Sequence, residues 1–347
     1  MHGALQVVWT LSIALAALSS VSMVTLIGAR LVRQHRDGGL IVRRKQLSSE
    51  LLRYALSGGE LPVFPVRTRH DRALIVQTAL DTSTLLDEEA RARVSGVLRS
   101  ASLDGWLRKS ARRGPVPDRI AAIEAMRLFP GAETSRALDT LEASSIFRIC
   151  IASLRTRVEI GDLPDLASVL KLTERPEGGR SLTLFKIVEA CVRADLPGAL
   201  LLLDRGLPAM ARIMMLKALG VSGSWAASRN IASATRDPDP EIRAAAMTAL
   251  RALGIPAAIP FFVEATHDPD WQVRLKAVEG IGQLGKPEDR ASIEPLLNDS
   301  VWWIRFRADE ALHRLDGRNA LPLPQDPPKK RKRSRTSAVR SGLAVAS

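Results

Sequence analysis

A segment that recurs with a period of about 31 residues most constrains the fold of this chain, because such periods are typical of repeat architectures. Three stretches align without gaps, and they begin at Asp237, Asp268 and Asp299. One period upstream, Arg212 and Leu219 keep the same register. The chain is therefore predicted to be a stack of similar units. Its shared columns hold an Asp, an Arg, an Ala and two large aliphatic positions: Asp237/Asp268/Asp299, Arg243/Arg274/Arg305, Ala246/Ala277/Ala308, Leu250/Ile281/Leu312 and Leu253/Leu284/Leu315.

Each unit is predicted to be a pair of helices. Apolar residues at helical spacing form one stripe along each aligned stretch, and the leading Asp can accept hydrogen bonds from free N–H groups at the helix start. Gly254 and Gly285 follow the stripe and are expected to end the helices in a left-handed conformation. Shorter apolar segments, 256–267 and 289–299, supply the second helix of a pair. A pair cannot bury its stripe alone, so the prediction is an all-α solenoid.

Composition agrees with an all-α fold. Only 4% of the residues are aromatic while 46% are hydrophobic, which leaves too little aromatic filling for a large β-sandwich or barrel. Cys150 and Cys191 lie far apart in apolar runs, so we expect two buried thiols in a reducing compartment and no disulfide framework. Arginine greatly outnumbers lysine, which is typical of a GC-rich, bacterial genome.

The N-terminal segment is predicted to anchor the chain in a membrane. Residues 3–29 contain no Asp, Glu, Lys or Arg, and about 20 helical residues suffice to cross a bilayer. Basic residues follow this segment directly, and the positive-inside rule places them in the cytoplasm. The expectation is therefore a single-pass protein of the inner (cytoplasmic) membrane, with its N-terminus outside and its repeats in the cytoplasm.

The net charge of +13 is concentrated in two short segments. Nearly all of the excess lies just after the apolar N-terminus and in the C-terminal tail, so the body between them is almost neutral. A neutral body argues against nucleic-acid binding, which needs a basic face. The basic residues are predicted to contact anionic lipid head groups: Arg30, Arg33, Arg36, Arg43, Arg44, Lys45, Lys329, Lys330, Arg331, Lys332 and Arg333.

Six regions follow from these patterns. They are a transmembrane anchor (1–29), a basic juxtamembrane segment (30–46), a helical region without repeats (47–114), degenerate repeats (115–205), regular repeats (206–317) and a disordered polybasic tail (318–347).

Catalytic motifs are absent from the sequence. The segment 280–286, GIGQLGK, matches a phosphate-binding glycine pattern, but the repeat register places it in the last turns of a helix, where such a loop cannot form. The five histidines form no metal-binding or hydrolase motif. We therefore expect no enzymatic activity, no cofactor, no metal and no small-molecule substrate.

Two columns of the repeat are candidate functional positions. The Arg column (Arg212, Arg243, Arg274, Arg305) either pairs with the Asp column (Asp237, Asp268, Asp299) of the adjacent repeat or forms an anion-binding ladder, and the pairing is favoured. Trp271 and Trp302 share one column, and Trp303 follows. These tryptophans either cover the seam between repeats or serve as anchors for a partner, because Trp and Arg dominate binding hot spots. At least one of Trp302 and Trp303 is predicted to contact a partner.

The recurring pattern of Asp, Val/Ile-Arg, Ala and Leu-Gly resembles the short HEAT-like repeats of the phycobilisome-lyase type. The resemblance covers 206–317 well and 118–131 more weakly. The predicted order of anchor, basic stretch and repeats also resembles bacterial membrane-anchored HEAT-repeat proteins, some of which accompany envelope glycosyltransferases. The resemblance implies a scaffold that binds membrane-associated protein partners. The alternatives are a nucleic-acid-binding HEAT protein and a phycobilin-lyase-like, chromophore-binding protein.

Overall fold

A computed structural model describes residues 42–58 and 68–317, together with residues 19, 22, 23, 64 and 66. Every regular element in these described residues is helical, so the prediction of an all-α repeat fold is confirmed for them. The chain divides into two compact units, Met1–Ala199 (unit 1) and Leu200–Ser347 (unit 2). The boundary falls inside helix α10 (Leu196–Asp204).

Unit 1 consists of helices of unequal length, and an apolar core extends from the helix at 42–57 to α7. The side chains of Leu51, Leu98 and Leu138 are fully buried in this core. Polar side chains set several helix starts: Thr68 forms a capping box with Asp71. Besides the helix at 42–57, the unit contains α2 (Arg69–Ser83), α3 (Glu88–Ser100), α4 (Leu103–Arg112), α5 (Val116–Ala125), α6 (Ala132–Glu142), α7 (Phe147–Glu159), α8 (Leu166–Lys171) and α9 (Leu182–Ala194).

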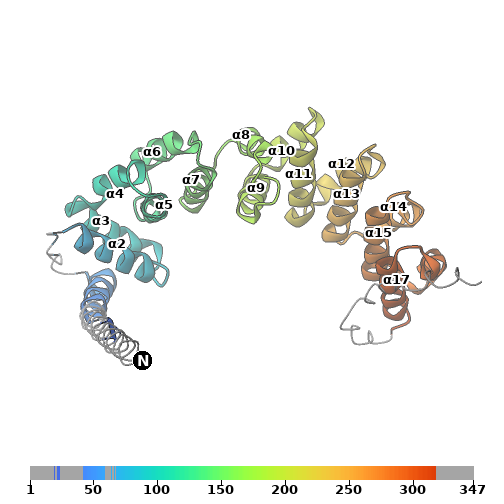
Figure 1. Ribbon diagram of the computed structural model, residues 1–347, viewed down its shortest axis with the longest axis horizontal. Coiled ribbons are helices and arrows are strands. Elements are labelled where there is room, and N and C mark those ends of the chain that lie inside the picture. The colour runs from blue at the N-terminus through green and yellow to red at the C-terminus, as the bar shows by residue number, and fades with distance from the viewer. Residues whose placement is uncertain are drawn as a thin grey trace, which may run out of the picture. The chain divides into compact units, whose positions relative to one another are not determined.

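Unit 2 alternates long and short helices at a constant period. The long helices are α11 (Ala209–Ser222), α13 (Pro240–Leu253), α15 (Trp271–Leu284) and α17 (Trp302–Leu315). The short ones are α12 (Ser228–Ser233), α14 (Ile259–Ala265) and α16 (Arg290–Ile293), each flanked by 3-10 turns. Successive long helices pack against each other, α11 on α13, α13 on α15 and α15 on α17, as Figure 1 shows. This regular packing is the solenoid-like arrangement expected of stacked helix pairs.

Small residues let the long helices of unit 2 approach closely. The Ala column of the repeat, Ala246, Ala277 and Ala308, is completely buried. A Cβ atom added at Gly220 of α11 would lie 2.6 Å from the Cα atom of Ala249 in α13, which is closer than a real contact. Glycine at this position is therefore a requirement of the distance between the two helices.

The two glycines that follow the apolar stripe behave differently. Gly254 ends α13 in the left-handed conformation, with φ of 67°, as expected. Gly285 follows α15 with φ of −74° and ψ of 168°, so the expectation of a left-handed cap is wrong there. The next backbone N–H, of Lys286, donates to the Asp289 carboxylate at 2.8 Å, which holds the chain extended as it enters the following short helix.

The predicted membrane localisation is corrected by the described helices. None of them has the length and apolar character that a membrane span requires. The longest, 42–57 and Arg69–Ser83, have 16 and 15 residues and carry several charged side chains, whereas a span needs about 20 predominantly apolar residues. A single-pass inner-membrane topology is therefore not supported. The segment 1–29 lies outside the described residues except for residues 19, 22 and 23.

Candidate protein-interaction edge

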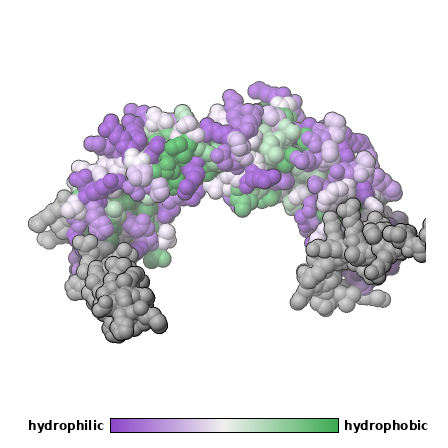
Figure 2. Space-filling view, in the orientation of Figure 1, coloured by the Kyte–Doolittle hydropathy of each residue, from purple (hydrophilic) through white to green (hydrophobic). Residues whose placement is uncertain are grey.

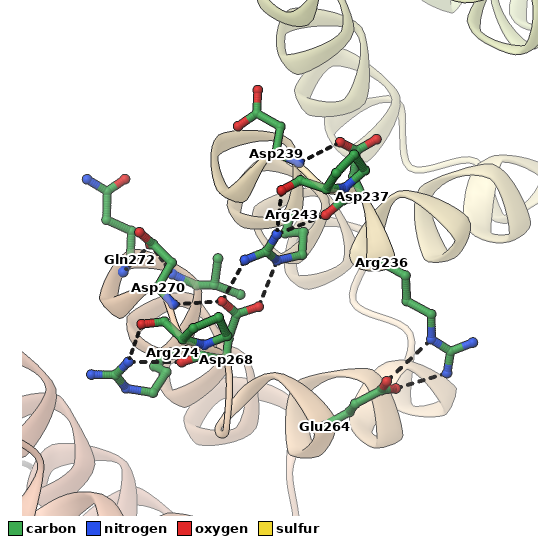
Figure 3. A network of polar contacts seen from close by, with 12 residues as sticks. Arg236, Asp237, Asp239, Arg243, Glu264, Asp268, Asp270, Gln272 and Arg274 are labelled. Carbon is green, nitrogen blue, oxygen red and sulfur yellow. Dashed lines mark hydrogen bonds and ion pairs between the residues drawn. The ribbon is translucent and has the colours of Figure 1, made fainter.

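A ladder of arginine and aspartate side chains runs along the starts of the long helices in unit 2. In α13, the Nε and Nη2 atoms of Arg243 donate to the two carboxylate oxygens of Asp268 at 2.7 and 2.8 Å. Its remaining nitrogen, Nη1, donates to the backbone carbonyls of Asp237 and Pro238 at 2.9 and 3.1 Å. Figure 3 shows this guanidinium between its own repeat and the next. Arg243 therefore ties the start of its own helix to the start of the following repeat.

The same arrangement recurs one repeat further. Nε and Nη2 of Arg274 donate to Asp299 at 2.8 and 3.1 Å, and Nη1 donates to the carbonyls of Asp268 and Pro269 at 2.9 and 3.1 Å. At the upstream end, Arg212 pairs with Asp237 through Nη1. Bidentate contacts of this kind fix geometry as well as charge. The structure therefore brings each of these arginines to the aspartate that begins the following repeat.

The aspartates of the ladder are not themselves the helix caps. One carboxylate oxygen of Asp237 accepts from the N–H of Asp239, and Asp268 accepts likewise from Asp270, both at 2.9 Å. Asp239 and Asp270 then cap α13 and α15 with their own side chains. The sequence interpretation placed the cap two residues too early, because the leading Asp stabilises the turn before the helix while it also binds the arginine.

The ionisation of the ladder follows its contacts. Burial raises the pKa of Asp268, but hydrogen bonds from Arg243 and from the Asp270 N–H outweigh it, so the pKa lies below its ordinary value. The same balance, with hydrogen bonds from Arg274 and the Val301 N–H, lowers the pKa of Asp299. Both carboxylates are therefore ionised at neutral pH and pair with the arginine of the preceding repeat.

Tryptophans lie beside this ladder at the first turns of the long helices. Trp271 is 40% exposed and Trp303 is 47% exposed. Trp302 is half-buried, stacks on Phe306 with ring centroids 5.4 Å apart, and meets Trp303 edge to face at 4.7 Å. The structure thus separates the three residues into one packed ring and two exposed rings. We call Trp271, Trp302 and Trp303 the tryptophan edge.

Two features of the described residues were missed from the sequence. Trp225 is 65% exposed at the turn after α11, and it occupies the column that holds Pro256 and Pro287 in the next repeats. In unit 1, the Arg157 guanidinium contacts three carboxylates, those of Asp139, Glu142 and Asp162 at 2.7, 3.0 and 2.9 Å. The repeat columns would have singled out Trp225, whereas no periodic signal marks Arg157.

The basic residues named for lipid contact are only partly described. Arg43 pairs with Asp71 at 2.9 Å, and Arg44 pairs with Asp81, so both contact helix α2 of their own unit. Lys45 is exposed. The others lie outside the described residues: Arg30, Arg33, Arg36, Lys329, Lys330, Arg331, Lys332 and Arg333.

The thiols and the candidate metal ligands show no reactive arrangement within the described residues. Cys150 and Cys191 are both buried and free. Burial raises the pKa of the Cys191 thiol to about 11, so it is protonated at neutral pH. Across residues 42–58 and 68–317, no three His, Cys, Asp or Glu side chains come together in a way that could hold a metal ion.

Comparison with known families agrees with this geometry. A family model of HEAT repeats matches residues 196–270 and 259–323. Residues 196–323 contain HEAT repeats. The match covers the regular long and short helices of unit 2 and includes the ladder. A search of curated proteins finds no match.

Solved structures give more distant similarities. One is human deoxyhypusine hydroxylase in complex with glycerol, with 16% identity, 80% of this chain and 99% of that chain covered, and a TM-score of 0.32. Another is the complex of CpcE and CpcF of phycocyanin lyase from Nostoc sp. PCC7120, with 16% identity, 75% of this chain and 99% of that chain covered, and a TM-score of 0.23.

Proposed function

We propose that this protein is a non-catalytic scaffold that binds another protein through the tryptophan edge of its HEAT repeats. The observation that carries the proposal is the exposure of Trp271 and Trp303 at the starts of neighbouring long helices. Large aromatic side chains are costly to leave in water and are enriched at binding hot spots. The face of each unit that Figure 2 shows is mostly hydrophilic, with separated apolar patches.

The ladder supports this assignment by making the edge rigid. Arg274 holds the turn that precedes α15 and the turn that precedes α17, the helices that carry the tryptophans. A side chain on a rigid element loses less conformational entropy on binding than one on a mobile loop. The arginines of the ladder have a structural role in this proposal, and the exposed indole rings make the contact.

The proposal can be tested by site-specific photo-crosslinking of the full chain in its native host. A photoreactive residue at Gln272, beside Trp271, samples the tryptophan edge. The same residue at Gln283 is the matched control, because both glutamines are exposed on α15 but lie at opposite ends of the helix. We expect a discrete cross-linked protein from position 272 and not from position 283.

Binding to the captured protein then decides the assignment. The double variant Trp271→Ala, Trp303→Ala should weaken affinity by about 30-fold or more, as expected for hot-spot residues. Equal crosslinking from both positions, or an affinity of the double variant within about twofold of the native chain, would refute binding at this edge.

A further inference from the structure

The last arginine of the repeat column, Arg305, is oriented like its counterparts but makes fewer contacts. Its Nη1 atom donates to the carbonyls of Asp299 and Ser300 at 2.7 and 3.3 Å. In Arg243 and Arg274 the equivalent atom makes the same two backbone contacts, while Nε and Nη2 bind the leading aspartate of the next repeat. In the part of the chain that the structure describes, no carboxylate pairs with Nε and Nη2 of Arg305. The guanidinium edge that binds an aspartate in two repeats is therefore unpaired in the third.

The acidic side chains nearest to Arg305 along α17 are turned to other cations. Asp309, one turn further on, faces His313, with Nε2 3.7 Å from its carboxylate. Glu310 accepts from two other arginines of the same helix. Asp316 pairs with an arginine of the preceding short helix at 2.7 Å. A carboxylate for Arg305 would therefore come from outside these helices.

The side of α17 that carries Arg305 is accessible. Asp309 follows Arg305 by four residues, so the two lie on the same face of the helix. Asp309 is exposed, whereas the same column in α13 and α15 holds the buried residues Met247 and Val278. A polar residue in a column that is otherwise buried and apolar indicates a side that no further repeat covers. Arg305 itself is partly exposed.

We propose that Arg305 binds an aspartate side chain of another protein, in the position that the leading aspartate of a further repeat would take. Charge complementarity supports this ligand, because a guanidinium binds a carboxylate through two parallel, charge-assisted hydrogen bonds. The contacts of Nη1 already hold the side chain, so little conformational freedom is lost on binding. Arg305 and Trp303 are two residues apart and point to different sides of the helix. The inference therefore goes beyond the tryptophan edge and does not depend on it.

The ladder indicates which kind of carboxylate fits. Asp268 gives both oxygens to Arg243, and one of them also accepts from the N–H of Asp270 at 2.9 Å. Asp237 accepts from the N–H of Asp239 in the same way. This hydrogen bond from two residues further on fixes a short carboxylate relative to its own backbone. The expected ligand is therefore an aspartate at such a turn on the partner, and not a free small acid.

The test is a titration of the full-length chain, followed by nuclear magnetic resonance of the arginine Nε–H groups. The probe is a capped peptide with the sequence of residues 265–270, ATHDPD, which contains the turn of Asp268. In the control peptide, asparagine replaces that aspartate. The Nε–H signal of Arg305 is assigned by its loss in Arg305→Lys. We expect a saturable shift of this signal with a dissociation constant of roughly millimolar size, while the signals of Arg243 and Arg274 stay in place.

The control peptide should bind at least about tenfold more weakly, in line with the loss of charge-assisted hydrogen bonds. Acetate at the same concentrations should also bind less tightly than the probe, because it lacks the turn. Equal responses to the two peptides, or to acetate and the probe, would contradict recognition of an aspartate at a turn. A signal of Arg305 that exchanges slowly with solvent in the chain alone and does not respond to the probe would mean that the chain supplies its own carboxylate. That result would overturn the proposal.

Discussion

The two units of this protein arrange their arginine–carboxylate contacts in different ways. Unit 2 distributes them, with one Arg–Asp contact joining each repeat to the next at a constant sequence separation. Unit 1 gathers three of them on one guanidinium, that of Arg157, which binds Asp139 and Glu142 of α6 and Asp162 after α7. The difference shows that a periodic sequence produces a network in which each contact is local, whereas an irregular one can depend on a single side chain.

The largest effect is expected from the central arginine of unit 1. Arg157→Met leaves Glu142 without its cation in a half-buried position, and breaking such a network by removing one partner costs about 3–4 kcal/mol. Hydrogen exchange resolved by residue should show loss of protection throughout α6 and α7 and little change in α15. Equal loss of hydrogen-exchange protection in both units would contradict the confinement of the Arg157 network to unit 1.

A somewhat smaller and more local effect is expected in the ladder. Asp268→Ala removes the partner of Arg243 and should lower the free energy of unfolding by about 2–3 kcal/mol, because both side chains are largely buried. The matched control is Glu264→Ala in the same repeat, which breaks the exposed pair with Arg236 seen apart from the ladder in Figure 3. The control should leave the denaturant midpoint unchanged.

The close contact between α11 and α13 can be tested with one methyl group. Gly220→Ala should destabilise unit 2 by about 1–2 kcal/mol, because the new Cβ atom meets the backbone of Ala249. Gly96→Ala in α3 of unit 1 is the control, since nothing lies within 4 Å of its Cβ position. The control should stabilise the chain by about 0.5–1 kcal/mol, in keeping with helix propensity. Stabilisation by both substitutions would contradict the packing described for unit 2.

One carboxylate from each unit, Asp268 of the ladder and Glu142 beside Arg157, should respond to pH with opposite sign. The lowered pKa of Asp268 adds stability that is complete above the ordinary Asp pKa of about 3.9 and is lost as pH falls through the folded value. Burial raises the pKa of Glu142 despite the hydrogen bond from Arg157, so its contribution is present at low pH and is lost as pH rises. The stability gap between the native chain and Asp268→Asn should therefore shrink toward pH 2. Relative to Glu142→Gln, the native chain should instead lose stability as pH rises. If thermal unfolding showed both stability differences changing with pH in the same direction, these signs would be contradicted.

The smallest effect on stability is expected at the tryptophan edge. Trp303 is 47% exposed and contacts Trp302 only edge to face, so Trp303→Ala should change the free energy of unfolding by about 0.5 kcal/mol or less. A loss above about 2 kcal/mol in thermal unfolding would show that this ring is part of the core and would remove it from the proposed interface.

The sequence predicts unit 2 better than unit 1 for a physical reason. Because the period is maintained over three stretches, alignment of the stretches identifies the shared positions. The helix pairs and the pairing of Arg243 with Asp268 could therefore be predicted without the structure. The exact cap was missed because two aspartates precede α15: Asp268 accepts from the Asp270 N–H in the turn before the helix, and Asp270 caps the helix itself. The contacts of Arg157 could not be predicted, because its carboxylates come from segments that share no column.

The predicted membrane topology shows the limit of composition. The uncharged N-terminal segment predicts a membrane topology for the whole chain, but the described helices supply no membrane span. Exposure was similarly beyond the sequence: Trp271 and Trp302 share a column, yet the second stacks on Phe306 while the first is exposed. A column identifies equivalent backbone positions and does not determine which neighbours cover a side chain.

The central claim is that arginines hold the repeats together while tryptophans bind a partner. The most direct test measures the melting temperature and the affinity for the captured partner on two variants, Arg274→Gln and Trp303→Ala. For Arg274→Gln we expect a lowered melting temperature and, at temperatures where the variant is folded, only a modest loss of affinity, because the edge is less rigid without this arginine. For Trp303→Ala we expect a large loss of affinity with a nearly unchanged melting temperature. A normal melting temperature with lost affinity in Arg274→Gln would contradict the central claim and make the ladder itself the binding site.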